Sequence, residues 1–245
     1  MRASPRSSDS TRAYAWFSAL TSEDAALLDD LLAHGVPVDV LHPLRHSTAL
    51  MEATRLGRAT LVRWLIERGA APVFASGSPQ GTPIHCALHL HHFDIAWLLV
   101  DAAEEITPTD AYGCTALHAL VKSAIATDAT PEIRALCIAL IHKGCPIDAR
   151  DRDGTTALHY CVIHDMPEFA ELLLKQGANP NATVPETEVS PLSIAAMEKN
   201  LPMAELLMRY GADPYLKSTR GRTPAEVHPG IIRLMDDGYL SAARA

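Results

Sequence analysis

A hydroxyl residue followed by Ala or Pro opens six apolar stretches at nearly regular intervals along the chain. The openers are Thr48, Thr82, Thr115, Thr156, Ser190 and Thr223, and subtracting successive positions gives steps of 34, 33, 41, 34 and 33 residues. A period near 33 residues is typical of a stacked array of short repeats and not of one globular core. The longer step indicates one insertion.

Apolar positions inside a repeat follow the spacing of two short helices. In residues 151–184, two sets recur on helical faces: Leu158, Cys161 and Val162, then Phe169, Ala170, Leu173 and Leu174. Pro167 suits the first turn of the second helix, where its missing N–H costs nothing. One helix pair cannot bury two apolar faces alone, so we expect neighbouring repeats to cover each other.

A glycine follows the second predicted helix of most repeats. These glycines are Gly35, Gly69, Gly144, Gly177 and Gly211. Glycine adopts the left-handed conformation that ends many helices without steric cost. Ala103 stands where the period expects another glycine, which predicts a less well-capped helix there.

With these landmarks in register, the chain resembles the ankyrin-repeat family. The family signature, Thr-Pro-Leu-His-x-Ala followed by Leu-Leu-x-x-Gly-Ala-Asp, is matched by Thr-Pro-Ile-His-Cys-Ala at 82–87 and Leu-Leu-Met-Arg-Tyr-Gly-Ala-Asp at 206–213. Asp-Gly-Thr-Thr-Ala-Leu-His at 153–159 is a further match, and the resemblance covers nearly all of residues 13–237. It implies an all-α ankyrin-repeat solenoid: stacked helix-turn-helix repeats joined by β-hairpin-like loops.

We predict a disordered tail over residues 1–12 and a single repeat domain over 13–240, with about seven repeats including two caps. The repeats run approximately over 14–42 (cap), 43–76, 77–109, 110–150, 151–184, 185–217 and 218–240 (cap). The first cap should hold helices over Tyr14–Leu20 and Asp24–Ala33, and the last a short helix over Ile231–Met235. The insertion at 124–131 either extends a helix or forms a loop, and it is either a tolerated loop or a grip on a partner.

Composition limits the classes of partner and the cellular compartment that we expect for this chain. The net charge is −8 without a block of five like charges, which argues against a nucleic-acid partner. No apolar run approaches the roughly 18 residues that span a bilayer, so we expect no membrane partner. The five cysteines are an odd number without a C-x-x-C pair, which favours a reducing compartment. We predict the cytoplasm, with secretion by a bacterium into a host cytoplasm as the alternative.

Four histidines, His85, His89, His91 and His92, could hold a metal if one helix carried them. The resemblance implies instead that His85, like His118 and His159, is the signature histidine that hydrogen-bonds neighbouring backbone. Met51 and Ser193 replace it in two repeats, where we expect looser joints. The chain has no G-x-S-x-G, H-E-x-x-H or G-x-x-x-x-G-K-[ST] motif. We therefore predict no enzymatic activity, no cofactor and no metal.

The resemblance implies a module that binds another protein through its concave side, made of loop tips and the exposed ends of first helices. We expect a monomer acting as an adaptor, inhibitor or effector. The alternatives are a recruiting or regulatory subunit of an enzyme complex, or a metal-binding protein using the His85–His92 cluster. The predicted partner-binding residues are Arg45, Arg55, Leu56, His89, Leu90, Tyr112, Lys122, Arg152, Asp153, Ile163, His164, Met197, Glu198 and Arg220. Among them we expect the strongest contacts from Tyr112, Arg152, Leu90 and His164.

Overall fold

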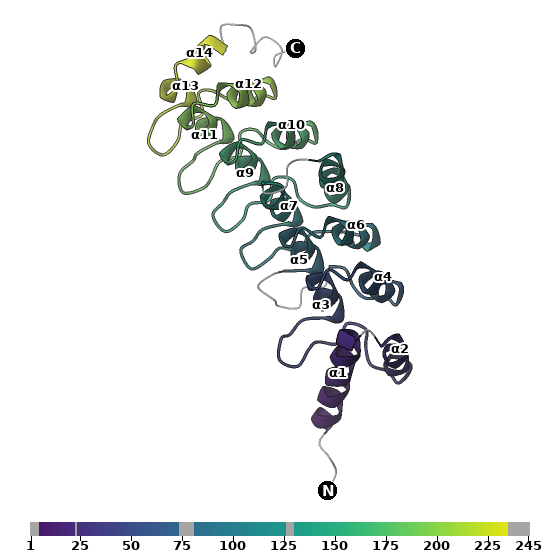
Figure 1. Ribbon diagram of the computed structural model, residues 1–245. Helices are drawn as coiled ribbons and strands as arrows, with labels where there is room; N and C mark the ends of the chain where they lie inside the picture. Colours follow the sequence, from purple (N-terminus) through teal and green to yellow (C-terminus); the bar gives the residue numbers. More distant parts are fainter. Residues whose placement is uncertain (1–4, 23, 74–80, 126–129, 235–245) are drawn as a thin grey trace. The chain divides into compact units, whose positions relative to one another are not determined.

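A computed structural model describes residues 5–22, 24–73, 81–125 and 130–234. In these residues the chain forms helices and no strands, and the helices follow one another as pairs (Figure 1). The pairs are α1 (Pro5–Ser22) with α2 (Ala25–Ala33), α3 (Ala49–Arg55) with α4 (Ala59–Glu67), α5 (Pro83–His89) with α6 (Phe93–Ala102), α7 (Ala116–Ala124) with α8 (Pro131–His142), α9 (Ala157–Ile163) with α10 (Pro167–Lys175), α11 (Pro191–Met197) with α12 (Leu201–Arg209), and α13 (Pro224–Val227) with α14 (Gly230–Leu234). The all-α repeat fold predicted from the sequence is confirmed.

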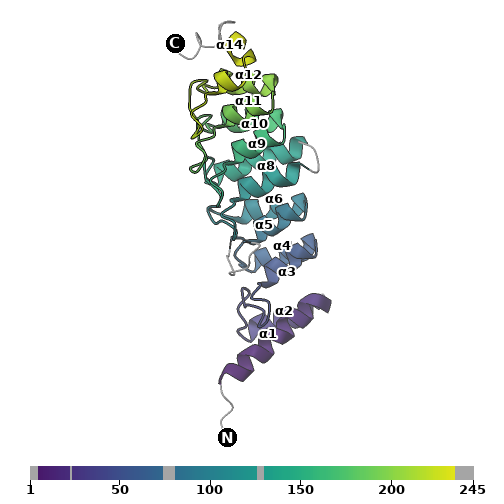
Figure 2. The same ribbon diagram turned by 90° about the vertical axis from the view of Figure 1, so that its left-hand side faces the viewer.

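The chain divides into two compact units, Met1–Ala111 and Tyr112–Ala245, called here the first and the second unit. In the first unit α3 packs on α5 and α4 on α6, and in the second unit α9 packs on α7 and α11. The connecting loops of the second unit project to the same side of its helix stack (Figures 1 and 2). The predicted extent of one repeat domain, residues 13–240, stays a prediction. In the part of the chain described here, no helix is both long and apolar enough to cross a membrane.

The hydroxyl residues that open the apolar stretches are the N-caps of the first helices. Thr48, Thr156 and Ser190 each accept a hydrogen bond from the backbone N–H three residues later. Such a cap satisfies one of the N–H groups that a helix leaves unpaired at its start. The openers therefore fix where each first helix begins.

Burial follows the predicted apolar faces. Leu158, Cys161 and Phe169 are at most 1% exposed, and Leu50, Leu65 and Leu99 are fully buried in the first unit. All five cysteines are buried, and none forms a disulfide. Neighbouring helix pairs supply the cover that a single pair lacks.

The predicted glycine stops are also found. The five glycines after the second helices have φ between +81° and +91°. Ala103 takes φ −78° and ψ 140°, so α6 ends without a left-handed residue. The expectation that this helix is less well capped stays a prediction.

The ends of the chain differ from the prediction in detail. Helix α1 begins at Pro5, so residues 5–12, which we predicted as part of a disordered tail, are helical. Their polar sequence lacks an apolar period, but it contains no glycine and only one proline, and that proline stands at the helix start, where it is tolerated. The last helix is Gly230–Leu234, and Met235 lies outside the described residues.

The insertion after α7 is described in part. Helix α7 ends at Ala124, and α8 starts at Pro131 with Thr130 as N-cap. Residues 126–129 lie outside the described residues. Whether this segment grips a partner stays a prediction.

The loop tips share one left-handed turn residue, two positions before the opener. Gly113, Gly154 and Gly221 occupy this position with φ of +74° to +75°, and His46 and Glu188 do so with φ of +52° and +50°. Left-handed backbone costs a residue with a side chain about 1 to 2 kcal/mol, which glycine avoids. The same turn is therefore relaxed in three tips and strained in two.

Gly154→Ala is expected to lower the free energy of unfolding by about 2 kcal/mol, because an added Cβ is strained at this φ and meets the ring of Pro185. Glu188→Gly, at the equivalent turn, is expected to cause no loss and a gain of up to about 1 kcal/mol after the higher chain entropy of unfolded glycine is subtracted. Urea unfolding of both variants measures the difference. Equal destabilisation by both substitutions contradicts this account of the turns.

Candidate functional site

The predicted partner-binding residues lie in two places, the loop tips and the C-terminal ends of the first helices. Arg45, Arg152 and Asp153 lie in loops, as do Tyr112 and Arg220. The remaining nine lie at or just beyond the ends of α3, α5, α7, α9 and α11: Arg55, Leu56, His89, Leu90, Lys122, Ile163, His164, Met197 and Glu198. All fourteen are exposed except Lys122, which is half-buried. Their role in binding stays a prediction.

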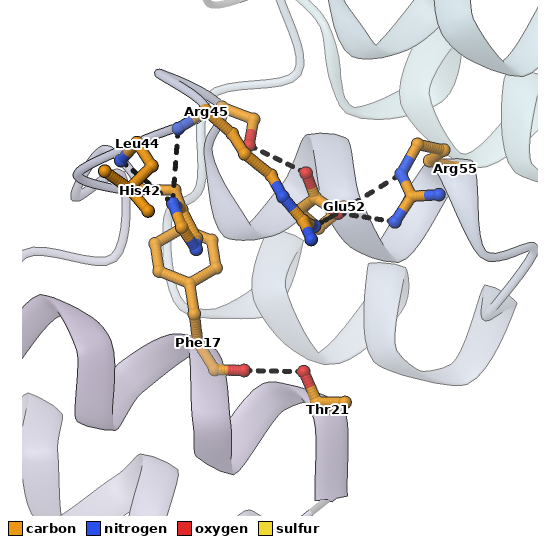
Figure 3. A network of polar contacts seen from close by, with 8 residues as sticks. Phe17, Thr21, His42, Leu44, Arg45, Glu52 and Arg55 are labelled. Atoms are coloured by element: carbon orange, nitrogen blue, oxygen red, sulfur yellow. Dashed lines mark hydrogen bonds and ion pairs between the residues drawn. The ribbon is translucent and has the colours of Figure 1, made fainter.

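In the first unit, Arg45 and Arg55 meet on the carboxylate of Glu52 (Figure 3). Arg45 Nη1 lies 3.2 Å from Glu52 Oε2, and Arg55 donates to the same oxygen from Nη2 at 2.8 Å and from Nε at 3.2 Å. The hydroxyl of Ser47 donates to Glu52 Oε1 at 2.8 Å. We call Arg45, Glu52 and Arg55 the Glu52 bridge, because it connects a loop tip to the end of α3.

The loop that carries Arg45 is held by hydrogen bonds to the side chain of His42. His42 Nδ1 accepts hydrogen bonds from the backbone N–H groups of Leu44, at 3.1 Å, and Arg45, at 3.3 Å (Figure 3). Its ring packs edge-on against Phe17 of α1, with centroids 4.7 Å apart. Contacts within the chain itself therefore fix the Arg45 backbone.

Glu52 remains a carboxylate in this setting. Its side chain is only 9% exposed, and burial alone would disfavour the charge. The hydrogen bonds from Arg55 and Ser47 and the positive charges of both arginines outweigh burial, so the pKa of Glu52 lies below its ordinary value. The bridge thus contains two cations and one anion at neutral pH.

In the second unit, Lys122 is held by a ring, an acid and a thiol. Its Nζ lies 4.2 Å from the centroid of the Tyr160 ring, 3.2 Å from Cys114 Sγ and 3.9 Å from Asp151 Oδ2. The Tyr160 hydroxyl donates to Asp151 Oδ2 at 2.7 Å. Burial opposes the charge of Lys122, but its contacts with Tyr160 and Cys114 outweigh burial and raise its pKa.

Asp151 also shapes the loop tip. Its Oδ1 accepts the backbone N–H groups of Asp153, at 3.1 Å, and Thr155, at 3.0 Å. Bonds of this kind from an Asp to the backbone that follows it are typical of tight turns. One buried carboxylate therefore orders the tip and neutralises the lysine beside it.

Neighbouring tips of the second unit are tied together through the backbone. The N–H of Arg152 donates to the carbonyl of Tyr112 at 2.9 Å, and the N–H of Thr219 donates to the carbonyl of Thr187 at 3.0 Å. Around them, Tyr112 is 65% exposed, Ile163 47% and Met197 49%. The His164 ring lies parallel to that of Tyr160, with centroids 6.4 Å apart. We call Tyr112, Lys122, Arg152, Ile163, His164 and Met197 the second-unit face.

The structure brings together only some of the predicted residues. Arg45 meets Arg55 through Glu52, and Tyr112 meets Arg152 through the backbone. Within the described part of the chain, the structure shows no side-chain hydrogen bond or ion pair joining another predicted residue to Ile163, Met197, Glu198 or Arg220. Ile163, Met197 and Glu198 lie at helix ends and Arg220 lies in a loop, and all four are exposed.

The signature histidines join successive repeats of the second unit. His118 Nε2 lies 3.0 Å from the carbonyl oxygen of Thr155, and His159 Nε2 lies 3.3 Å from that of Val189. At the two substituted positions, Met51 is buried and Ser193 shares a contact of 3.2 Å with Ser190 Oγ inside its own repeat. The looser joints expected there stay a prediction.

The histidines of 85–92 occupy different environments. His85 is fully buried and lies 2.9 Å from the hydroxyl of Thr82, whereas His89 is exposed at the end of α5. His91 takes a left-handed φ of +58°, and His92 is the N-cap of α6. In the residues described, no group of three or more His, Cys, Asp or Glu side chains is arranged to hold a metal ion.

Sequence reasoning missed three residues that organise these surfaces: Glu52, Asp151 and Tyr160. A signal existed for Glu52, since it is a charged residue in the middle of the buried stretch from Ala49 to Thr54. Tyr160 occupies the same register, one position after the signature site. No sequence pattern shows that Asp151, in a loop, reaches the side chains of a neighbouring helix.

Comparison with known proteins gives a consistent result. The family model described as ankyrin repeats (3 copies) matches residues 16–110, 50–130, 104–184 and 124–218. The chain is 30% identical over 201 residues to the ankyrin repeat and KH domain-containing protein mask-1 of Caenorhabditis elegans, covering 81% of this chain and 7% of that protein. It is 31% identical over 195 residues to the B-cell lymphoma 3 protein homolog of Mus musculus, covering 78% of this chain and 41% of the relative. The chain thus spans less than half the length of either relative.

Solved structures show the same fold. The ankyrin repeat domain of Bcl-3 superposes with a TM-score of 0.76 at 26% identity, over 91% of this chain and 97% of that one. An ankyrin repeat domain from Acinetobacter baumannii AYE gives a TM-score of 0.68 at 26% identity, over 80% and 97% of the two chains.

Glu52→Gln is expected to lower the free energy of unfolding by about 1 to 2 kcal/mol at pH 7, because hydrogen bonds from two arginines lose their charged acceptor. The folded-state pKa of Glu52 is depressed below 4.5, so its stabilisation is complete above that pH and is lost as the pH falls through the folded-state pKa. Urea unfolding of both proteins between pH 3 and pH 7, roughly the range that brackets this titration, measures the difference.

The matched control is Glu198→Gln, at an exposed carboxylate of the second unit. It is expected to change stability by less than about 0.5 kcal/mol. The free energies of unfolding of the original chain and of Glu52→Gln are compared at each pH. If their difference stays constant down to the lowest pH, the ion pairs of Glu52 contribute nothing to stability.

Proposed function

This chain belongs to the ankyrin-repeat family, and we propose that it is a non-enzymatic module that binds another protein through its loop tips and first-helix ends. Ankyrin repeats mediate binding to other proteins, and the matched residues of this chain contain only repeats. Because a fold does not determine function, the proposal depends on the surface and not on the family alone. The second-unit face carries it.

The supporting observation is that the second-unit face combines exposed apolar side chains with fixed cations. Tyr112, Ile163 and Met197 expose about half or more of their surface, and the backbone of Arg152 is held against that of Tyr112. Aromatic residues, Met and Arg are enriched in protein interfaces, and Tyr and Arg dominate their binding energy. Exposed apolar residues of this size, grouped with cations, favour a protein partner over plain solvated surface.

The face is also ordered in advance. Asp151 fixes the turn that presents Arg152, and the Tyr112 carbonyl holds the Arg152 backbone. Lys122 is confined between the Tyr160 ring and the acid. A surface that is already rigid loses less conformational entropy on binding, which raises affinity without additional contacts.

Several roles fit such a module: an adaptor, an inhibitor that covers a partner's site, a bacterial effector, or the recruiting subunit of an enzyme complex. The structural relative Bcl-3 is described as a unique member of the IκB protein family. We further propose a reducing compartment, the cytoplasm, because the five cysteines are buried as thiols and not paired in disulfides.

Replacing both Tyr112 and Arg152 with Ala is expected to weaken capture of the native partner at least tenfold, because each side chain is of a type that contributes about 2 kcal/mol or more at interface centres. The measurement is affinity capture from the native cell, followed by titration of the identified protein against the purified variant. Both substitutions are in exposed loops, so the fold should persist.

The matched control replaces Tyr215 and Arg209 with Ala. These are also an exposed tyrosine and an exposed arginine of the second unit, but they lie outside the second-unit face. Arg209 is the last residue of α12, and Tyr215 lies in the loop that follows. The control should retain the partner. A partner held equally well by the Tyr112 and Arg152 variant, or lost equally by the control, overturns the proposed surface.

A further inference from the structure

The Glu52 bridge holds more hydrogen-bond donors than Glu52 uses. Each guanidinium carries five N–H groups. Contacts with Glu52 engage Nη1 of Arg45 and Nε and Nη2 of Arg55. The carboxylate therefore draws two guanidinium groups to one place without using most of their N–H groups.

The carboxylate of the Glu52 bridge is buried, whereas its two guanidinium groups are exposed to solvent. The Glu52 side chain is 9% exposed, whereas those of Arg45 and Arg55 are 61% and 43% exposed. Two cations against one anion leave one excess positive charge at the surface of a chain whose net charge is −8. An anionic partner group would meet the guanidinium edges first and the acid of the bridge last.

The bridge is fixed in position from both ends. Ser47 binds the second carboxylate oxygen of Glu52, and the Arg45 backbone is held by His42. Arg55 binds Glu52 through two nitrogens, a forked geometry that fixes the plane of a guanidinium. Pre-ordered arginines bind a carboxylate with a smaller loss of side-chain entropy.

Apolar side chains stand next to both arginines. Leu44, beside Arg45, is 74% exposed, and Leu56, beside Arg55, is 44% exposed. The loop tip and the helix end thus each present one cation and one leucine. This pattern is complementary to a segment in which acidic and apolar residues alternate.

We propose that the Glu52 bridge is a docking site for an acidic peptide segment of a partner protein, with a carboxylate on Arg45 and Arg55 and apolar side chains on Leu44 and Leu56. This inference rests on the proposed protein-binding function and assigns a partner chemistry to the first unit. The partner's carboxylate joins Glu52 on the two guanidinium groups and neutralises the excess charge.

Fluorescence anisotropy with the full chain tests the proposal. The probe is a labelled peptide of alternating Glu and Leu, and the comparison peptide has Gln in place of every Glu. The Glu peptide is expected to bind at least tenfold more tightly than the Gln peptide at low ionic strength, with the preference shrinking as salt screens the charges. Equal affinities for the two peptides overturn the proposal.

Variants then locate the binding. Arg45→Gln combined with Arg55→Gln should remove the preference for Glu over Gln. Because this variant leaves the Glu52 charge without cations, a second variant also carries Glu52→Gln, so that no unpaired buried charge impairs folding. It should lose the preference equally. The control, Arg63→Gln with Arg209→Gln, removes the same charge from exposed positions on α4 and α12 and should keep the preference.

The outcomes separate this inference from the proposed function. A preference that survives in both bridge variants, or disappears in the control, overturns the docking site. If the peptides show no preference while the Tyr112 and Arg152 variant still loses its cellular partner, only the inference about the first unit fails. If the peptide result holds and that variant keeps its partner, the second-unit face fails instead.

Discussion

A histidine ring joins each of two helix pairs of the second unit, α7 with α8 and α9 with α10, to the loop of the next pair, and the arrangement of the surface depends on this contact. The Nδ1 atoms of His118 and His159 accept the backbone N–H of their own helix opener, at 3.2 and 3.3 Å. Their Nε2 atoms face the carbonyls of Thr155 and Val189, so Nε2 carries the proton. Burial lowers the pKa of His159, which favours the neutral ring that can accept on one side and donate on the other. Because each carbonyl directly follows a loop tip, the same ring that starts a helix also sets where the next tip lies.

This dependence explains which parts of the fold the sequence predicted. Openers and glycine stops act through local backbone chemistry, so Thr156 and Gly177 could be assigned from their neighbours alone. The start of α1 at Pro5 was missed because its first residues show no apolar period, although a proline is a residue type that suits a helix start. The exposed positions of the candidate surface were also predictable, since they are the positions that the repeat leaves unburied. The contacts that organise them, such as Tyr160 with Lys122, join residues 38 positions apart, and no local pattern encodes such a pair.

Where the signature histidine is replaced, neighbouring repeats of the second unit are connected by other hydrogen bonds. Ser193 stands where the histidine is expected, and its hydroxyl pairs with Ser190 in the same repeat. The following loop is tied to its neighbour by Thr219, whose N–H and hydroxyl both donate to the carbonyl of Thr187, at 3.0 and 3.1 Å. A tip-to-tip contact is more exposed than a buried imidazole contact and competes with water, so it contributes less to stability. This end of the second unit therefore depends more on helix packing than on its polar joints.

The two candidate surfaces place different residue types at the same positions of the repeat, and the resulting contacts differ. Arg55 and Lys122 both stand four positions after the signature site, and Glu52 and Tyr160 both stand one position after it. In the first unit the acid lies on the same helix as the cation, so the arginines spread outward from a buried carboxylate. In the second unit the ring and the acid come from the next repeat and enclose the lysine, which leaves Tyr112, Ile163 and Met197 as the prominent groups. The first surface is thus suited to an anionic group and the second to apolar and aromatic ones. Since the signature residues are buried in both, we propose that the choice of partner depends on the few positions that the signature leaves free.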